Sequence, residues 1–250
     1  MTDPEYLPRL DGERMAYLRQ AGRGPGLMWL GGFNSDMNGT KAQAVAAFAA
    51  REGRASLRFD YFGHGASSGA FADGTISRWR EDALAALDHL TEGPQILIGS
   101  SMGGWMTSLV ALARPERIAA VVLIAPAPDL TEELMWQRMP PAIRDEITTR
   151  GRWFYQPENG EGYPITRGLI ESGRDNLVLG KTITVDGPVR ILHGTDDRDV
   201  PWQLGARLLD VYQGDVTFTL VKGADHRLSE PAHIRLLETT LATVLKDLSC

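Results

Sequence analysis

Gln95-Ile96-Leu97-Ile98-Gly99-Ser100-Ser101-Met102-Gly103 is the stretch that decides the fold of this chain. Its first half is typical of a buried strand, and a helical pattern begins at Met102. The residues between them match G-x-S-x-G, which in a strand–turn–helix context holds a serine on a sharp turn above a sheet. The spacing to the two glycines selects Ser101, and not its neighbour Ser100, as the candidate nucleophile. The alternative is that these small residues merely let the helix pack closely on the sheet.

On both sides of this turn, short apolar runs alternate with helical patterns. The predicted strands are Leu27–Leu30, Ala55–Tyr61, Gln95–Gly99, Ala119–Ala125, Val189–Leu192 and Val216–Val221. The predicted helices are Thr40–Arg51, Ile76–Thr91, Met102–Ala113, Pro201–Tyr212 and Glu230–Asp247. Continuously apolar strands are typical of a parallel sheet buried on both faces. The alternation predicts an α/β fold with a mostly parallel central sheet and helices on both faces.

The segment from Pro126 to Asp186 breaks this alternation. It contains no convincing strand but is rich in large apolar residues. A plain loop of that length is improbable inside a compact domain. We therefore expect a core domain formed by residues 1–125 and 187–250, with a helical cap, residues 126–186, inserted in it. The cap is expected to lie over the C-terminal edge of the sheet, where open α/β sheets bind ligands.

The composition is that of a globular protein with one large domain. The chain has 250 residues, of which 43% are apolar, and 26 Lys and Arg against 32 Asp and Glu, which gives a net charge of −6. This acidic balance argues against nucleic-acid binding, for which a basic footprint is typical. The longest apolar run, Ile118 to Ala125, has eight residues, far fewer than the ~20 that span a membrane.

The single cysteine and the N-terminal sequence predict a compartment. Cys250 is the only cysteine and belongs to no metal-binding pattern, so that neither an intrachain disulfide nor a cysteine metal site is expected. The N-terminal region carries acidic residues and no apolar signal-peptide segment. The cytoplasm is therefore the expected compartment.

Two polar segments follow predicted strands at the edge where Ser101 is expected. Val189–Leu192 leads into His193-Gly194-Thr195-Asp196-Asp197-Arg198-Asp199-Val200-Pro201, and Val216–Val221 leads into Lys222-Gly223-Ala224-Asp225-His226. A serine hydroxyl needs a base to become a nucleophile, and the base needs a third group that orients it. In serine hydrolases whose nucleophile lies on a strand–turn–helix, the serine comes first in the sequence, the acid (Asp or Glu) second and the histidine last.

The motifs together resemble the α/β-hydrolase superfamily over nearly the whole chain. In that superfamily H-G-x-x-D-x-x-V-P carries the acid of a catalytic triad, and G-x-x-H after the last strand carries the base. The resemblance implies that Ser101 attacks, His226 relays the proton and Asp197 orients the imidazole. Asp129 is the alternative acid, because some members take it from the end of the preceding strand. Three neighbouring acids are interpreted as loop charges or as poorly placed to orient the ring: Asp196, Asp199 and Asp225.

An oxyanion hole is expected beside Ser101. Its first donor is the backbone N–H of Met102, the residue after the nucleophile. Leu27–Leu30 leads into Gly31-Gly32-Phe33-Asn34, where members of the family commonly carry H-G-x or G-G-x, and this points to the N–H of Phe33 as the second donor. The alternative is a plain glycine turn.

One further motif has two readings. Phe62-Gly63-His64-Gly65-Ala66-Ser67-Ser68-Gly69 approaches a dinucleotide-binding fingerprint, but no helix begins inside it. Similar hydrolases carry D-x-x-G-x-G-x-S here, which matches Asp60, Gly63, Gly65 and Ser67. We therefore expect no nucleotide cofactor. The histidines outside the proposed triad are expected to be structural: His64, His89, His193 and His233.

Several segments resemble one branch of the superfamily, the mitochondrial acyl-protein (palmitoyl) thioesterases and acyl-glucuronide esterases. They are Asn38–Ala42, Arg58–Tyr61, Gly93–Leu97, Gly99–Trp105, Val200–Trp202 and Asp225–Arg227. The chain lacks the Arg- and Ser-rich transit peptide of a mitochondrial precursor, so that a cytoplasmic relative is expected. A mitochondrial matrix form is expected only if a transit peptide has been removed.

These observations predict a serine hydrolase that cleaves carboxylic esters or thioesters through an acyl-enzyme, without metal or cofactor. The expected substrates are small molecules or S-acylated proteins. Residues expected to line the substrate pocket are Trp105, Trp136, Met139, Phe154, Arg138 and Arg152, with one of the two arginines recognising an anionic leaving group. The alternatives are a C–C bond hydrolase or a peptidase with the same triad, or a non-catalytic relative that binds a ligand under the cap.

Overall fold

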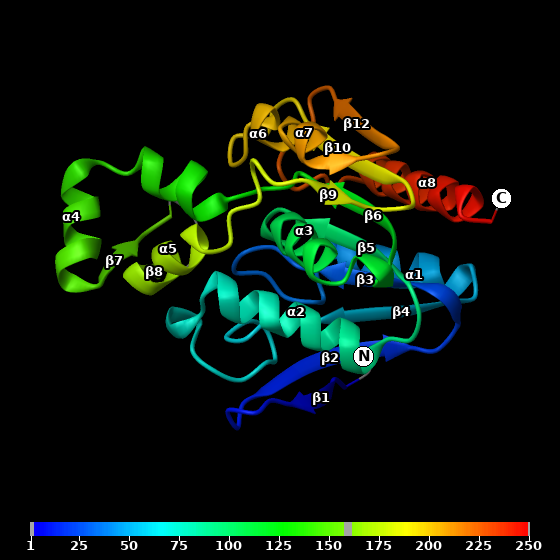
Figure 1. Cartoon of the computed structure of the whole chain (residues 1–250), viewed down its shortest axis with the longest axis horizontal. Coiled ribbons are helices and arrows are strands. Elements are labelled where there is room, and N and C mark those ends of the chain that lie inside the picture. The colour runs from blue at the N-terminus through cyan, green and yellow to red at the C-terminus, as the bar shows by residue number, and fades with distance from the viewer. Residues whose placement is uncertain (1–2, 158–161, 250) are drawn as a thin grey trace.

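The computed structural model describes residues 3–157 and 162–249, so that Cys250 lies outside the described residues. Its central feature is an eight-stranded sheet with the strand order β1-β2-β4-β3-β5-β6-β10-β12 (Figure 1). The strands are β1 (Glu5–Pro8), β2 (Arg14–Gln20), β3 (Arg23–Leu30), β4 (Arg54–Phe59), β5 (Gln95–Ser100), β6 (Ile118–Ile124), β10 (Val189–Gly194) and β12 (Val216–Val221). Only β1 and β2 are antiparallel to their neighbours. The predicted mostly parallel α/β fold is confirmed.

Helices cover both faces of this sheet, because side chains alternate between the faces along each strand. α1 (Thr40–Arg51) and α8 (Pro231–Asp247) pack on the face that receives Leu27 and Trp29 of β3. α2 (Ile76–Leu90) and α3 (Met102–Ala113) pack on the face that receives Met28 and Leu30 of the same strand. The sheet therefore separates two apolar cores, and the predicted bounds of α1 and α3 are confirmed.

Residues 126–157 and 162–174 form a lobe beside the C-terminal ends of the parallel strands, and the chain then returns to the core, where residues 183–184 lie near β6 and β10 (Figure 1). After β6 come a π-helix (Thr131–Met135), a 3-10 turn (Trp136–Arg138), α4 (Pro141–Arg150), β7 (Arg152–Tyr155), β8 (Tyr163–Thr166), α5 (Arg167–Arg174) and β9 (Ile183–Thr184). The segment contains helices, as predicted, but the expectation that it has no strand is wrong, because β7 and β8 pair as an antiparallel hairpin with Trp153 opposite Ile165. Strands of four residues are too short to show a period in the sequence.

Three further details differ from the sequence prediction. Strands β1 and β2 form the antiparallel edge of the sheet, where the sequence showed no buried apolar run. The predicted helix Pro201–Tyr212 is divided into α6 (Trp202–Ala206) and α7 (Leu208–Val211), and Tyr212 begins the short strand β11 (Tyr212–Gln213), which pairs with β9.

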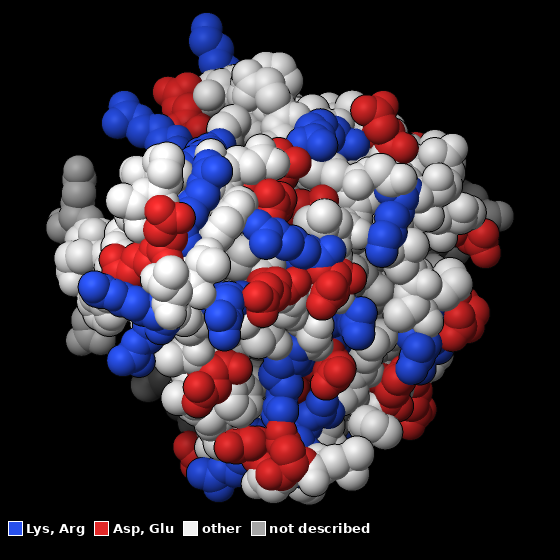
Figure 2. All heavy atoms as spheres, turned by 60° about the vertical axis from the view of Figure 1, so that its left-hand side comes forward, with Lys and Arg blue, Asp and Glu red and all other residues white. Residues whose placement is uncertain are grey.

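The surface carries both signs of charge. Figure 2 shows acidic and basic side chains interspersed over the face that includes the lobe, without a large area of one sign. Within residues 3–157 and 162–249, no helix combines the length and apolar character that a membrane crossing requires.

Candidate active site

Ser101 lies on the sharp turn between β5 and α3. Its backbone has φ 55° and ψ −121°, a conformation that residues with a side chain rarely adopt. A Cβ at Gly99 would overlap the carbonyl oxygen of Gly103, and a Cβ at Gly103 would overlap that of Leu30. The two glycines of the motif are therefore required by close packing around the turn, as the strand–turn–helix reading predicted.

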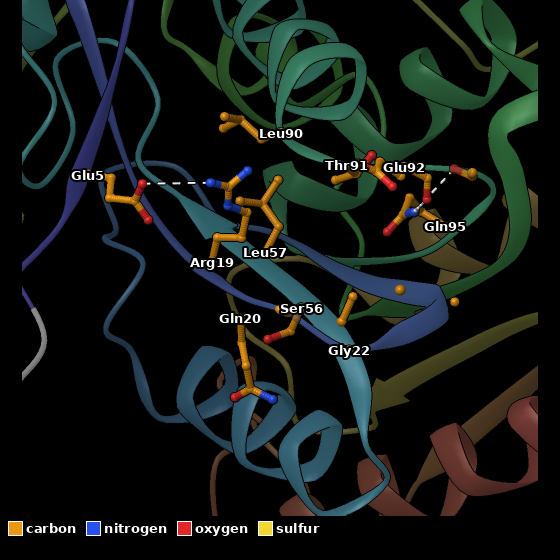
Figure 3. Close-up of a pocket in the computed structure, with 15 residues that line it drawn as sticks. Glu5, Arg19, Gln20, Gly22, Ser56, Leu57, Leu90, Thr91, Glu92 and Gln95 are labelled. Atoms are coloured by element: carbon orange, nitrogen blue, oxygen red, sulfur yellow. Dashed lines mark hydrogen bonds and ion pairs between the residues drawn. The ribbon is translucent and has the colours of Figure 1, made fainter.

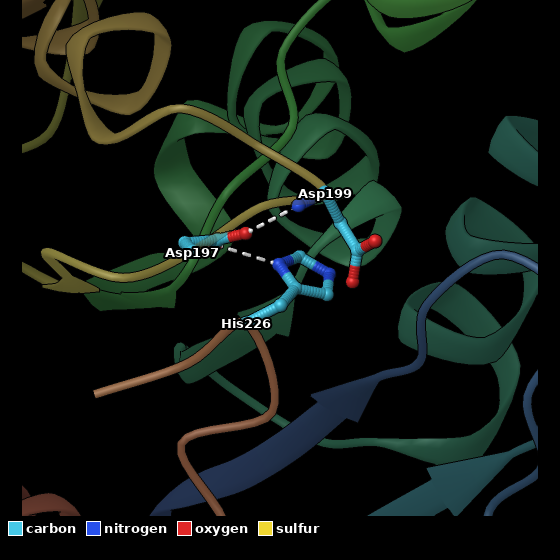
Figure 4. Close-up of side chains that lie close together, drawn as sticks. All are labelled: Asp197, Asp199 and His226. Carbon is cyan, nitrogen blue, oxygen red and sulfur yellow. Dashed lines mark hydrogen bonds and ion pairs between the residues drawn. The ribbon is translucent and has the colours of Figure 1, made fainter. Parts of the chain in front are cut away.

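A chain of hydrogen bonds joins Ser101 to the loops after β10 and β12. Ser101 Oγ lies 3.0 Å from His226 Nε2, and His226 Nδ1 lies 2.7 Å from Asp197 Oδ2. Figure 4 shows Asp197 and His226 reaching toward each other from separate loops. The parallel strands end at one edge of the sheet, and this brings together groups that are 125 and 29 residues apart in the sequence.

The Asp197 carboxylate is buried and fully hydrogen-bonded. Oδ1 accepts the backbone N–H groups of Asp199 at 3.0 Å and Val200 at 2.8 Å, while Oδ2 accepts from His226 and from His193 Nε2 at 3.1 Å. Burial alone would raise the pKa of Asp197. The hydrogen bonds from His193, His226 and Val200 outweigh it and hold the pKa well below its usual value, so that Asp197 is a carboxylate at neutral pH.

The rival acids make other contacts. Asp129 is buried, and its two oxygens accept the backbone N–H groups of Val178 at 2.7 Å and Leu179 at 3.0 Å. Asp225 accepts the N–H of Leu228 at 3.2 Å. The geometry thus joins Asp197, and not Asp129 or Asp225, to the imidazole of His226.

The two residues expected to supply the oxyanion hole, Met102 and Phe33, both lie next to Ser101, one along the chain and one on the wall of the same cavity. Met102 is the first residue of α3, so that its N–H has no acceptor within the helix. Phe33 follows Gly31-Gly32, and a Cβ at Gly32 would lie 3.4 Å from Ser101 Cβ. The loop after β3 therefore runs directly beside the serine.

An apolar cavity of about 530 Å³ opens on Ser101, His226 and Phe33. The lobe supplies most of its wall: Leu130, Leu134, Met135, Arg138, Met139, Pro140, Ile143, Trp153, Tyr155, Tyr163 and Ile165. Among the pocket residues expected from the sequence, Met139 and Arg138 line this cavity.

The other four expected pocket residues lie elsewhere. Trp105 is buried in the core, where its Nε1 donates to the carbonyl of Asn176 at 2.9 Å. Trp136 packs between the guanidinium groups of Arg144 and Arg174. Phe154 and Arg152 are exposed on the hairpin and are absent from the cavity wall. The sequence could not show which aromatic residues of this segment face the cavity. That depends on the hairpin, which places Trp153 and Tyr155 in the cavity wall and which the sequence did not predict.

Two other cavities differ in character. One of about 480 Å³ adjoins the same Ser101 and His226 but is polar, with Ser35, Asp36 and Lys41 in its wall. Burial lowers the pKa of Lys41 to about 8, although Asp225 and Asp197 oppose this. The third, about 740 Å³, lies where β3 and β5 begin, at the opposite ends of the strands from Ser101, and its wall includes Gly24, Gly26 and Gln95 (Figure 3).

The group best placed for a metal ion in the described part of the chain is Asp197, Asp199 and His226, whose ligand atoms lie within 4.8 Å of one another (Figure 4). Asp197 and His226 are already joined through Oδ2 and Nδ1. The second ring nitrogen, His226 Nε2, lies 3.0 Å from Ser101 Oγ, so that both nitrogens of the imidazole already have hydrogen-bond partners and the arrangement suits proton transfer.

The sequence matches a family model described as serine aminopeptidase, S33, over residues 27–162. A mouse (Mus musculus) protein, palmitoyl-protein thioesterase ABHD10, mitochondrial, is 40% identical over 98% of this chain and 83% of its own. The chain belongs to the α/β-hydrolase family. This hydrolase is 37% identical to the human (Homo sapiens) palmitoyl-protein thioesterase ABHD10, mitochondrial, over 99% of this chain and 82% of that protein.

Solved structures agree with this assignment. Mouse α/β hydrolase domain-containing protein 10 superposes on the hydrolase with a TM-score of 0.91, 38% identity and coverage of 99% and 100% of the two chains. A crystal structure from Agrobacterium vitis S4 gives the same TM-score at 40% identity, covering 97% and 98%. The curated relatives are named as mitochondrial, which does not support the cytoplasmic prediction for this α/β-hydrolase.

Proposed function

We propose that this α/β-hydrolase is a serine thioesterase and esterase that removes apolar acyl groups through an acyl-enzyme. The observation that carries the proposal is the Ser101–His226–Asp197 hydrogen-bond chain at the mouth of an apolar cavity of about 530 Å³. A cavity of this size and polarity suits an apolar ligand. The printed activity of the relatives, palmitoyl-protein thioesterase, supports S-acylated proteins as substrates.

The reaction follows from the proposed roles of these residues. His226 Nε2 takes the proton of Ser101 while Oγ attacks the acyl carbonyl carbon, and Asp197 stabilises the imidazolium. The N–H groups of Phe33 and Met102 stabilise the negative oxygen of the tetrahedral intermediate. Collapse breaks the C–S or C–O bond, and His226 returns the proton to the leaving thiol or alcohol. Water then attacks the acyl-enzyme by the same route and releases the carboxylic acid.

The two cavities beside Ser101 suggest that the two parts of the substrate bind in different places. The apolar cavity under the lobe suits the acyl chain, and the polar cavity beside Lys41 suits the leaving group. In this assignment residues 126–186 act as the cap that selects the acyl chain.

The test is a comparison of matched palmitoyl substrates: an S-palmitoyl peptide, its O-palmitoyl serine analogue and a palmitoyl amide. Wild-type protein is expected to hydrolyse the first two, and the Ser101→Ala variant neither. Hydrolysis of the amide or of unacylated peptides alone would favour a peptidase. A protein that hydrolyses none of them and does not react with a fluorophosphonate would be a ligand-binding relative.

A further inference from the structure

The motif Asp60-x-x-Gly63-x-Gly65-x-Ser67 supports the loop that carries Phe33, here called the Phe33 loop (residues 31–38). Asp60 is buried, and its Oδ1 accepts the backbone N–H of Met37 at 2.7 Å while Oδ2 accepts that of Ala66 at 2.8 Å. A Cβ at Gly65 would overlap this carboxylate. The glycines therefore let the loop after β4 fold tightly around Asp60, which is tied to the Phe33 loop.

His64 makes a second link, at the residue next to Phe33. The backbone N–H of Asn34 donates to His64 Nε2 at 3.1 Å, and His64 Nδ1 lies 3.0 Å from the carbonyl oxygen of Phe62. A carbonyl can only accept and a backbone N–H can only donate, so these two bonds require a neutral imidazole with its proton on Nδ1. The side chain is 3% exposed.

The backbone that His64 holds has an uncommon conformation. Asn34 has φ 54°, in the left-handed region that few residues with a side chain adopt. The hydrogen bond from its N–H to His64 fixes the orientation of the peptide bond between Phe33 and Asn34. A change at Asn34 would be transmitted to Phe33 through the peptide bond that they share.

The same aromatic rings surround His64 and the Phe33 side chain. Phe71 and Trp79 lie with their ring centroids 5.1 Å from that of His64, and 5.0 and 5.7 Å from that of Phe33. Trp79 Nε1 donates to the carbonyl of Phe62 that also accepts from His64. One buried cluster thus fixes both the ring and the backbone of the Phe33 loop.

We propose that His64 is a positioning residue of the reaction, which holds the Phe33 loop so that the Phe33 N–H points to the oxyanion formed when Ser101 attacks. The inference rests on the proposed function, in which Phe33 supplies that donor. An oxyanion donor is effective only when it is fixed before the charge develops. Because a misplacement of 1 Å from a distant mutation costs up to about 10²-fold in rate, loss of this link is expected to be measurable.

The first test is kinetic, with a short-chain acyl thioester as substrate. His64→Phe retains an aromatic ring but removes the acceptor, and we expect kcat to fall about 10- to 100-fold, with KM changed by less than about threefold. His64→Gln offers an amide oxygen to Asn34 and is expected to recover most of the rate. His89→Phe, at an exposed histidine of α2, is the matched control and is expected to retain wild-type kinetics.

The second test separates positioning from a general loss of structure. A trifluoromethyl ketone adds to the serine hydroxyl and forms an oxyanion, whereas the product carboxylic acid binds without addition. In His64→Phe the affinity for the ketone should fall by the same factor as kcat/KM, and the affinity for the acid should not change. If His64→Phe does not fold, His64→Leu takes its place.

Two results would overturn the proposal. One is a kcat of the acceptor-free variant within about twofold of wild type. The other is a loss of activity without a loss of affinity for the trifluoromethyl ketone. Neither result would touch the proposed thioesterase function, because wild-type turnover and its dependence on Ser101 are measured separately.

Discussion

Ser101 sits in a backbone conformation that is unfavourable by about 1–3 kcal/mol for a residue with a side chain. Its own backbone bonds hold it there: its N–H donates to the carbonyl of Ile124, and its carbonyl accepts from Gly104 and Ala127, at 2.9–3.0 Å. These partners come from the end of β6 and the start of α3. The strain is therefore offset by the junction of two elements, and the hydroxyl is left free to meet His226.

Gly103→Ala tests how tightly this junction is packed. The added Cβ would overlap the carbonyl of Leu30, and overpacking of this kind costs about 1–3 kcal/mol or more. We expect the melting temperature to fall by about 2–12 °C. Gly168→Ala in α5, where the new Cβ would have its nearest neighbour at 4.0 Å, is the control and should melt like wild type. An unchanged melting temperature for Gly103→Ala would show that the turn can relax.

The assignment of the acid can be tested by two amide substitutions. Asp197→Asn should lower kcat by about 10⁴, because the amide holds the wrong imidazole tautomer. Asp129→Asn should leave kcat nearly unchanged, because Asp129 contacts the backbone of Val178 and Leu179 and not His226. Steady-state kinetics on one short-chain thioester decides between them. A silent Asp197→Asn together with a damaging Asp129→Asn would contradict the assignment.

His64 also predicts a pH dependence of stability. Burial lowers the pKa of His64 below its usual value, and the Phe62 carbonyl opposes this only in part. The surrounding rings of Tyr61, Phe71 and Trp79 bring no charge at neutral pH. Because the unfolded chain takes up the proton first as the pH falls below about 6.5, the unfolding free energy should decrease there. Above that pH this contribution is fully present.

His64→Gln should flatten this dependence. We expect the difference in unfolding free energy between wild type and the variant to shrink as the pH is lowered from 7 to 5. Only wild type has the His64 imidazole, which takes up a proton more readily in the unfolded chain. Urea denaturation at several pH values measures it. A difference that stays constant over this range would mean that His64 is protonated equally easily in both states.

At the scale of elements, the ends of the parallel strands decide where the chemistry lies. β5, β10 and β12 end at the same edge, and the loops that follow them carry Ser101, Asp197 and His226. The continuous apolar runs made these strands predictable, and the strand–turn–helix context located Ser101. The hairpin β7–β8 was not predictable, since its strands are short and pack against residues distant in the sequence, such as Phe33, whose ring lies 5.3 Å from that of Tyr163.

The roles of His64 and His193 show a second limit of sequence reasoning. Both were interpreted as structural histidines, and both are buried. His64 accepts a hydrogen bond from Asn34, and His193 donates one to Asp197. These contacts link the two histidines to the residues proposed to take part in the reaction. The sequence places such residues after a strand, but it does not say which backbone group each imidazole meets.

The apolar cavity predicts the acyl selectivity. Met139 is buried in the cavity wall, and Met139→Trp would shorten the space available to an acyl chain. We expect kcat/KM for a palmitoyl ester to fall about 10-fold or more relative to the butyryl ester, since apolar pockets discriminate by ~1–3 kcal/mol per methylene. Phe154→Trp, at an exposed residue outside the cavity, is the control. Equal changes on both esters in Met139→Trp would place the acyl chain elsewhere.

At the scale of the whole molecule, two apolar cores pack against the two faces of the sheet, and the lobe stands beside the edge that carries Ser101 (Figure 1). The fold was predictable because strands and helices alternate over most of the chain. The contents of the lobe were not, and the lobe supplies most of the wall of the cavity against Ser101. In the proposed function, the part of the chain that selects the substrate is therefore the part whose structure is hardest to predict from the sequence.

The most direct test of the account is to trap the acyl-enzyme. Wild-type protein is mixed with an S-palmitoyl peptide, quenched with acid at intervals from milliseconds onward, digested and analysed by mass spectrometry, with Ser101→Ala treated in parallel. The account predicts a palmitoyl group on the peptide that contains Ser101, formed as the thiol is released and absent from the variant, which does not turn over. Continued hydrolysis by Ser101→Ala, or an acyl group on a different residue, would contradict it.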